Sequence, residues 1–444
     1  MLPLTPLEPA QRLNRDCACA TLQPERLRVA LESASVSSAG VGESGASGQL
    51  GVMGWLAETR PHLFAATPVF LSASVAVRIN QAVAAIEQAA ALPGWTAQAL
   101  ARAADSARID HGPAGVFMGY DFHLADDGPR LIEINTNAGG ALLNVVLARA
   151  HDPCCGEWPV LVAAPKSDSP WAQAPEQDFL AMFRAEWAAQ RGNAPLQRIA
   201  IVDDAPETQY LAPEFTLFRE LFRQAGYDSH VVDAAVLRHH DGRLWCGDDA
   251  IDLVYNRLTD FALDEARHAA LRTACDAGDV VVTPHPRVHA LFADKRNLAT
   301  LSDDAQLAAW GLDAAAREVI AAVVPATQEV TPENADALWA ERRQLFFKPF
   351  AGYAGKAAYR GEKITKKVWE DIRSGGFVAQ ALVPPAQRRV GSSGALKYDI
   401  RAYAYRGRVL LFAARLYEGQ TTNFRTEGGG FAPVIVLPDG VRPA

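Results

Sequence analysis

The sequence predicts an α/β protein of several domains that also carries α+β elements. Its 444 residues exceed the roughly 100–150 residues of a typical domain. Between residues 176 and 286, short apolar runs alternate with amphipathic stretches, which is typical of a parallel sheet covered by helices. Outside that region, apolar runs joined by Gly- and Asp-containing turns predict antiparallel strand pairs. We therefore expect two or three cores, built from both kinds of sheet.

Composition and charge exclude several classes of protein. The chain is 49% hydrophobic and 21% charged, and its net charge of −8 opposes binding to nucleic acid or to an anionic membrane surface. It has no uncharged apolar run of about 18 residues, the length that spans a membrane, and its first residues lack a secretory signal. The six cysteines are too few for a disulfide framework and are not spaced as zinc ligands. We therefore expect a cytoplasmic protein with reduced thiols and no zinc site.

The chain divides into four predicted regions: a helical region at 1–108, a hairpin region at 109–175, a parallel α/β region at 176–286 and a lysine-containing region at 287–444. The helical region contains a stretch near 33–51 that is rich in Ser, Gly and Ala and predicts a flexible linker. Its helices are expected at 24–31, 71–91 and 95–107.

The stretch GYDFHLADDGPRLIEINTNAGGALL, residues 119–143, predicts a strand, a turn, a second strand and a glycine-opened helix. Glu133 and Asn135 are two apart on a strand and so share a face, and the hairpin can bring Asp121 beside them. Three such oxygen donors suit Mg²⁺ or Mn²⁺. The alternative is a surface hairpin with solvated acids. The Gly139-Gly140 pair can also offer backbone N–H groups to an anion at the helix start.

In the parallel region, helices are expected at 179–191, 211–225 and 264–277, and strands at 198–202, 229–232, 251–256 and 280–283. Polar residues lie at the strand ends, where the carboxyl edge of such a sheet meets ligands: Asp203, Asp204, Glu207 and Asn256. They are equally explained as caps and turn residues.

The last region concentrates positive charge, since seven of the eight lysines lie from Lys295 onward. Lys295 lies within a helix predicted at 287–301. Lys348 interrupts an apolar strand predicted at 345–350, where an ammonium group is costly unless it meets an anion. A glycine-rich loop with Gly352 and Gly355 follows, and it predicts either a flap that closes over phosphates or an ordinary hairpin.

Further strands follow the flap. Gln380 lies on a strand predicted at 377–382, whose edge can meet an adenine ring. Residues 398–415 predict a long antiparallel pair that turns at Arg406-Gly407. Arg401 and Arg415 on these strands can clamp phosphate oxygens or a developing oxyanion. Polar loops are expected at 421–423 and 428–430.

These motifs resemble ATP-grasp ligases. FFKPFAGYAGKAAYRG, FVAQALVPP and KYDIRAYAYRGRVLLFAARLYEGQTTNF are similar to the nucleotide half of that family, and the D…E-x-N hairpin is similar to its metal half. Here the metal motif precedes the lysines, an order that resembles the circularly permuted members such as glutathionylspermidine synthase. The resemblance covers roughly residues 110–436 and implies that the parallel region is a pre-ATP-grasp-like substrate domain.

The resemblance implies ATP and Mg²⁺ (or Mn²⁺) as cofactors. It implies as metal ligands Asp121, Glu133 and Asn135; as ATP contacts Lys295, Lys348, Gly352, Tyr353, Gly355, Lys356, Gln380 and Asn423; and as catalytic groups Arg415 and Arg401. One departure stands out, because the family usually has an arginine where this chain has Gly119. Either Arg401 replaces it or the chemistry differs. Cys17 and Cys19 lack a histidine partner sequence, so no N-terminal amidase is expected.

The expected activity is that of an ATP- and Mg-dependent ligase that joins a small carboxylate to an amine through an acyl-phosphate. Two alternatives remain open: a nucleotide-binding protein without ligase activity, and a kinase-like enzyme that stops at a phosphorylated product. A homodimer is possible from the apolar N-terminal helices. The sequence does not specify the substrate pair.

Overall fold

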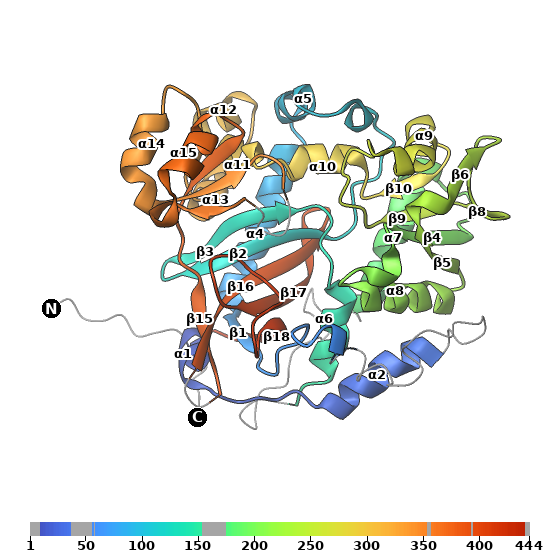
Figure 1. Cartoon of the computed structure of the whole chain (residues 1–444), viewed down its shortest axis with the longest axis horizontal. Coiled ribbons are helices and arrows are strands. Elements are labelled where there is room, and N and C mark those ends of the chain that lie inside the picture. The colour runs from blue at the N-terminus through green and yellow to red at the C-terminus, as the bar shows by residue number, and fades with distance from the viewer. Residues whose placement is uncertain are drawn as a thin grey trace.

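The computed structural model describes residues 9–36, 56, 58–152, 175–352, 357–391 and 394–439. These residues form a mixed α/β fold around one large curled sheet (Figure 1). Its strands, in spatial order, are β1 (Val69–Ser72), β18 (Gly430–Leu437), β17 (Arg408–Tyr417), β16 (Gly394–Tyr405), β2 (Met118–Ala125) and β3 (Gly128–Asn135), and β15 (Ala386–Val390) pairs with β16. All neighbours are antiparallel except β1 and β18.

The two faces of the large sheet differ because side chains alternate along each strand. Tyr120 and Phe122 of β2 and Ile400 of β16 are buried in a core that includes α4 (Ala73–Ala90) and α13 (Ala314–Val323). Asp121 lies between Tyr120 and Phe122, and Arg401 directly follows Ile400, so both project from the opposite face of the sheet. That face carries the charged residues of the predicted site.

A second sheet is parallel throughout, with strand order β10 (Val281–Thr283), β9 (Leu253–Asn256), β4 (Arg198–Asp203) and β5 (Asp228–Asp233). Alternate residues of β4 enter two different cores. Ile199 and Ile201 pack with α7 (Pro175–Arg191) and α8 (Ala212–Gln224), whereas Ala200 and Val202 pack with α9 (Ala269–Ala277). A small antiparallel sheet of β6 (Leu237–His240), β7 (Arg243–Cys246) and β8 (Asp249–Ile251) packs on the core that contains α9.

A third sheet is antiparallel, with strand order β11 (Thr327–Glu329), β14 (Phe377–Ala381), β12 (Leu345–Pro349) and β13 (Tyr359–Arg360). Its core contains Phe347 and Ala379 packed with α14 (Ala335–Glu341) and α15 (Lys366–Arg373). In Figure 1 this antiparallel unit lies at the upper left, above β2 and β3, and the unit with the parallel sheet lies at the right. Further helices in the described part of the chain are α1 (Pro9–Asp16), α2 (Pro24–Val36), α5 (Pro93–Ala101), α6 (Ala141–Arg149), α10 (Pro286–Phe292), α11 (Arg296–Leu301) and α12 (Asp304–Ala309).

Several predicted elements are confirmed. The hairpin of β2 and β3, the helix that follows Gly140, and the β16–β17 pair turning at Arg406-Gly407 are all present. Gly140 has φ 98°, a left-handed conformation that favours glycine, and an added Cβ would lie 2.2 Å from the Phe431 ring. The alternation of helices and strands in 176–286 corresponds to the parallel sheet.

Other predicted boundaries are wrong. The predicted helix 287–301 is broken at Lys295, and the predicted strand 251–256 is broken at Asp252, whose side chain accepts the backbone N–H of Arg198 at 2.9 Å. The predicted helices 71–91, 95–107 and 264–277 begin or end elsewhere, because Val69–Ser72 is a strand, α5 ends at Ala101, and a 3₁₀ turn precedes α9.

The two ends of the chain also differ from expectation. Strand β18 was not predicted beyond the glycines at 428–430. Helix α2 continues to Val36, so residues 33–36 of the predicted linker are helical, and its residues 37–51 lie outside the described part of the chain. No helix among the described residues has the length and apolar character needed to cross a membrane.

Candidate functional site

The large sheet brings the predicted acids and arginines onto one face. Asp121 on β2 is the register partner of Glu133 on β3 and of Arg401 on β16. Arg415 on β17 is opposite Asp399, which lies two residues before Arg401 and so shares its face. A β-bulge at Ile132 shifts the β2–β3 register next to Glu133. This set and the two lysines described below are called the ion-pair site.

Asp121 is held by donors on both of its carboxylate oxygens. Arg401 donates through Nε at 2.7 Å and through Nη2 at 2.7 Å, and Arg415 donates through Nη2 at 2.8 Å. The Asn135 amide donates to the same carboxylate at 2.9 Å. Burial alone raises the pKa of Asp121, but the two guanidinium groups outweigh it and hold the pKa below its usual value.

Arg415 is bound to a second carboxylate. It donates to both oxygens of Asp399 at 2.8 Å, and the Thr422 hydroxyl donates to that carboxylate as well. Burial lowers the pKa of Arg415, yet Asp121 and Asp399 outweigh burial and raise it well above its usual value. Both arginines are therefore permanently charged and fixed on adjacent strands.

Lys295 reaches Glu133 from outside the large sheet. The break between α10 and α11 places Lys295 at the start of α11. Its Nζ lies 2.8 Å from Glu133 Oε1 and donates to the Gly352 carbonyl at 3.2 Å. Burial raises the pKa of Glu133, but Lys295 and Lys348 outweigh it and the pKa lies below its usual value. An acid of the hairpin and a lysine of the last region thus lie together.

Lys348 lies on β12, an inner strand of the third sheet, and its side chain reaches the hairpin of β2 and β3. Its Nζ donates to the Gln380 side-chain oxygen at 2.7 Å and to the Ile132 carbonyl at 2.5 Å. Because Lys348 is buried, its pKa is lowered to about 8, although Glu133 raises it. The third sheet is therefore joined to the large sheet through this ammonium group.

The ion-pair site carries more positive than negative charge. Four cationic side chains, Lys295, Lys348, Arg401 and Arg415, face three carboxylates, those of Asp121, Glu133 and Asp399. An excess of cations held in place by the fold and away from bulk water stabilises a polyanion such as a polyphosphate. The arrangement is thus suited to an anionic ligand that brings its own counter-cation.

Two members of the predicted metal set fit Mg²⁺ in this arrangement. The Glu133 side chain is 27% exposed, and Asn135 turns its amide nitrogen to Asp121 and leaves the amide oxygen as a possible ligand. Mg²⁺ commonly takes one or two protein oxygens together with substrate phosphates and water. Asp121 fits less well, because its side chain is 5% exposed and its oxygens already accept from Arg401, Arg415 and Asn135.

Of the remaining predicted ATP contacts, some lie beside the lysines of the site and one does not. Gly352 lies beside Lys295, and Gln380 beside Lys348. Asn423 is engaged within its own loop, where it donates to the Glu418 carbonyl at 2.7 Å and accepts from Arg425 and Thr426. Tyr353, Gly355 and Lys356 lie outside the described residues.

Gly119 has no room for a side chain, because Ala138 and Arg401 lie close to where its Cβ would be. A Cβ added at Gly119 would lie 2.5 Å from the Ala138 Cβ and 3.4 Å from Arg401 Nε. Any side chain at this position would therefore displace its neighbours. The guanidinium that stands beside Asp121 comes from β16 instead of β2.

Sequence reasoning missed two acids, Asp399 of the ion-pair site and Glu214 at the start of α6. Asp399 was detectable, because the D-x-R spacing places it on the same face as Arg401. Glu214 of α8 was not: its carboxylate accepts the backbone N–H of Gly140 at 2.7 Å and of Leu142 at 3.0 Å. The helix start that sequence analysis offered to an external anion is therefore occupied by the protein's own carboxylate.

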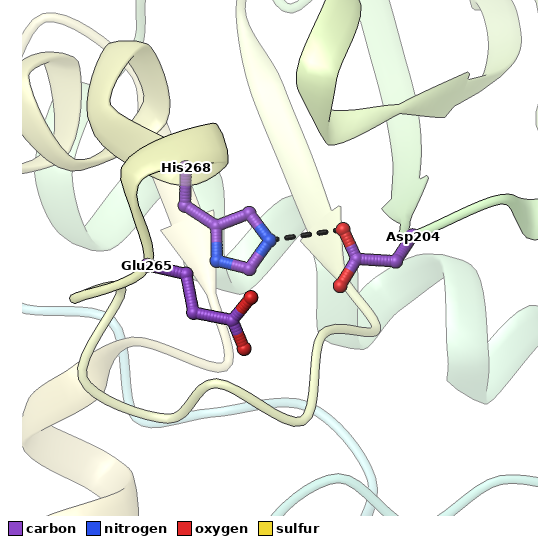
Figure 2. A group of neighbouring side chains, drawn as sticks. All are labelled: Asp204, Glu265 and His268. Atoms are coloured by element: carbon purple, nitrogen blue, oxygen red, sulfur yellow. Dashed lines mark hydrogen bonds and ion pairs between the residues drawn. The ribbon is translucent and has the colours of Figure 1, made fainter.

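The carboxyl edge of the parallel sheet holds a separate cluster of Asp204, Glu265 and His268 (Figure 2). His268 Nε2 contacts Asp204 at 3.0 Å and Nδ1 contacts Asp260 at 2.7 Å. Burial lowers the pKa of His268, but the two carboxylates outweigh it and raise the pKa above its usual value. An imidazolium that donates from both nitrogens has no lone pair for a metal, so we interpret this cluster as a structural ion pair.

Comparison with known proteins shows likeness in structure only. No protein-family model matches the chain, and no curated protein matches its sequence. A glutathione synthetase-like effector from Globodera pallida, in its apo form, is similar in structure with a TM-score of 0.51 and 14% identity, covering 84% of this chain and 90% of that chain. This likeness shows that the chain shares the overall fold of that effector.

Two further structures are less similar. A putative gamma-glutamylcysteine synthetase from Methylobacillus flagellatus has a TM-score of 0.44 and 11% identity, covering 83% of this chain and 87% of that one. The ATP-grasp ligase PsnB, in complex with a minimal precursor, Mg and ADP, has a TM-score of 0.29 and 16% identity, covering 54% and 88%. Likeness at this level carries no argument about function.

Proposed function

We propose that this protein is an ATP- and Mg-dependent ligase that joins a small carboxylate to an amine. The observation that carries the proposal is the contact of Lys295 with Glu133, beside which Lys348 joins the third sheet to the hairpin. We further infer a circularly permuted ATP-grasp fold, because the acidic hairpin precedes both lysines in the chain while lying against them in space. The parallel unit is then the substrate domain.

In the proposed reaction, a substrate carboxylate oxygen attacks the γ-phosphorus of ATP, the bond to the β-phosphate oxygen breaks, and ADP leaves. Lys295 and Lys348 exchange their protein acceptors for phosphate oxygens. Arg401 and Arg415 already stand fixed by carboxylates, so they can stabilise developing negative charge without reorganising. Glu133 and Asn135 would hold Mg²⁺, which neutralises phosphate charge when bound.

In the second step, the amine nitrogen attacks the acyl carbon, the carbon–oxygen bond to phosphate breaks, and the leaving phosphate takes up the proton that the nitrogen releases. Arg401 would take the role of the family's usual arginine, a role supported by its position next to Gly119 and its pairing with Asp121. This position supports the ligase over a nucleotide-binding protein that has lost its chemistry.

The test combines nucleotide binding with product analysis. Calorimetry with Mg·AMP-PNP should show binding to the wild-type protein, and Glu133→Ala should weaken it. ADP release with mixed carboxylates and amines should require both substrates, and mass spectrometry should find an amide. Binding without ADP release would favour the non-catalytic alternative, and a phosphorylated product without an amide would favour the kinase-like one. Absence of Mg·ATP binding, with Glu133→Ala changing nothing, would remove the proposal.

A further inference from the structure

A cavity of about 160 Å³ lies between α5 and α10, next to the ion-pair site. Most of its lining residues are alanines, and Phe261 from the parallel unit and Gly352 from the start of the predicted flap complete the wall. A volume of this size exceeds several waters at about 30 Å³ each but falls below the roughly 300 Å³ of a drug-sized pocket. It therefore suits a molecule of amino-acid size with a short apolar part.

Two ionisable residues of the lining contribute no net charge. His289 stacks on Phe261 with ring centroids 4.1 Å apart, and burial lowers its pKa to about 3, so its ring is neutral near pH 7. Asp294 is neutralised by Arg296, whose Nε lies 3.0 Å from each of its carboxylate oxygens. Neither group can attract an ionic ligand strongly.

Arg102 is different, because its hydrogen-bonding capacity is poorly used. Its contacts are long: Nη1 lies 3.5 Å from a Glu329 oxygen, and Nη2 lies 3.3 Å from the Asn297 side-chain oxygen. Its Nε has no partner among the described residues. Burial lowers the pKa of Arg102, although Asp294 and Glu329 raise it. A partly desolvated guanidinium with weak partners gains most from a carboxylate, which it can bind through two hydrogen bonds.

Two residues that line the cavity, Gly352 and His289, also contact residues at or next to the ion-pair site. The Gly352 carbonyl accepts from Lys295 Nζ at 3.2 Å, and Lys295 pairs with Glu133. His289 Nδ1 contacts the hydroxyl of Thr136, the residue directly after the predicted ligand Asn135. A molecule in the cavity would thus lie beside the place where phosphates are proposed to bind.

We propose that this cavity binds one substrate of the ligase, a small carboxylate with a compact apolar body, and that Arg102 anchors its carboxylate. The role as substrate rests on the proposed function, whereas binding itself does not. An inorganic anion would use Arg102 but not the alanine wall, so binding should require both features.

The experiment is calorimetry of the full chain without nucleotide, using propionate, butyrate, L-alanine, L-valine and inorganic phosphate as probes. The corresponding amides serve as controls that lack the carboxylate. At least one carboxylate should bind, and its amide should not. Arg102→Gln should weaken that binding by about tenfold to a hundredfold, since a charged hydrogen bond contributes roughly 1.5–3 kcal/mol. Arg102→Lys should restore part of it.

A substitution that fills the cavity tests the proposal without changing Arg102. Ala290→Leu places a larger side chain in the lining and should abolish binding, whereas Ala97→Leu, at an exposed position of α5, should leave it unchanged. Thermal unfolding of each variant checks that it is folded. Equal binding of phosphate and the carboxylates, no binding by any probe, or retention of binding in both Arg102→Gln and Ala290→Leu would overturn the proposal.

The readouts separate this proposal from the proposed function. Carboxylate binding without any binding of Mg·AMP-PNP would remove the ligase and leave the cavity as a ligand site. Nucleotide binding without carboxylate binding would remove the cavity as a ligand site and leave the ligase.

Discussion

Lys295 Nζ lies 2.8 Å from Glu133 Oε1, and this contact joins the break between α10 and α11 to the hairpin strand β3. Sequence places the two residues in different regions, and only the tertiary fold pairs them. Because Glu133 is also close to Lys348, two positive charges converge on one carboxylate. One carboxylate does not neutralise two ammonium groups, so the lysines can still bind an anion that carries more negative charge.

Lys295→Met should reduce Mg·AMP-PNP affinity by at least about tenfold, since it removes a charge-assisted contact worth roughly 1.5–3 kcal/mol. Calorimetry measures the loss. The matched control is Lys366→Met, because Lys366 is exposed on α15 and bears the same charge. Equal affinities for the two variants would contradict a role for Lys295 in nucleotide binding.

Nucleotide affinity should fall as pH rises through about 8, because burial lowers the pKa of Lys348 to about 8. Below that pH the ammonium is charged and attracts phosphate, and above it the free protein loses the charge. The affinity for AMP-PNP should then decrease by up to about tenfold for each further pH unit, as expected for linkage to one proton.

The control for this titration is Lys348→Arg, which keeps its charge at all accessible pH values. Its affinity should vary little between pH 7 and 9.5 even if it is weaker overall. A wild-type profile as flat as that of Lys348→Arg would show that Lys348 does not titrate in this range.

Gly119→Ala should destabilise the protein by roughly 1–3 kcal/mol, the usual cost of overpacking. The new Cβ would lie 2.5 Å from the Ala138 Cβ, so the strand and the segment before α6 must separate. Denaturant unfolding measures the change. The double variant Gly119→Ala/Ala138→Gly should recover most of the loss, because it removes the colliding atom. A single variant as stable as wild type would contradict the close contact.

Local sequence patterns were sufficient for the hairpin but not for its partners. Alternation along β3 and the turn residues at 126 and 127 placed Glu133 beside Asp121 correctly. The pairing of Asp121 with Arg401 and Arg415 depends on β2 lying next to β16, a contact between distant parts of the chain. Sequence alone therefore does not show that Asp121 pairs with two guanidinium groups.

The break at Lys295 depends on a local signal that helix propensity does not include. The stretch around it has good helix formers, which favoured one continuous helix. Asp294, however, accepts the backbone N–H of Arg296 at 2.9 Å, the behaviour of a residue that starts a new helix. Glu214 is the opposite case, since nothing near it in sequence indicates that it binds the start of α6.

The ion pairs of His268 should make stability depend on pH in a defined direction. Asp204 and Asp260 raise its pKa in the folded protein, whereas the unfolded chain releases this proton at about pH 6.5. The contribution is therefore complete below about pH 6.5 and is lost as pH rises through the higher folded pKa. His268→Gln should be less stable than wild type at pH 5.5 by roughly 2 kcal/mol, the worth of a charged hydrogen bond.

The difference between wild type and His268→Gln should shrink toward pH 9, and urea unfolding from pH 5.5 to 9 measures it. Comparing the two proteins at each pH matters because other buried acids titrate as well: burial raises the pKa of Glu87 to about 7 and that of Asp203 to about 6. These groups are present in both proteins and largely cancel. A difference that grows with pH would mean that His268 is neutral in the folded protein, and the cluster of Figure 2 would again be a candidate metal site.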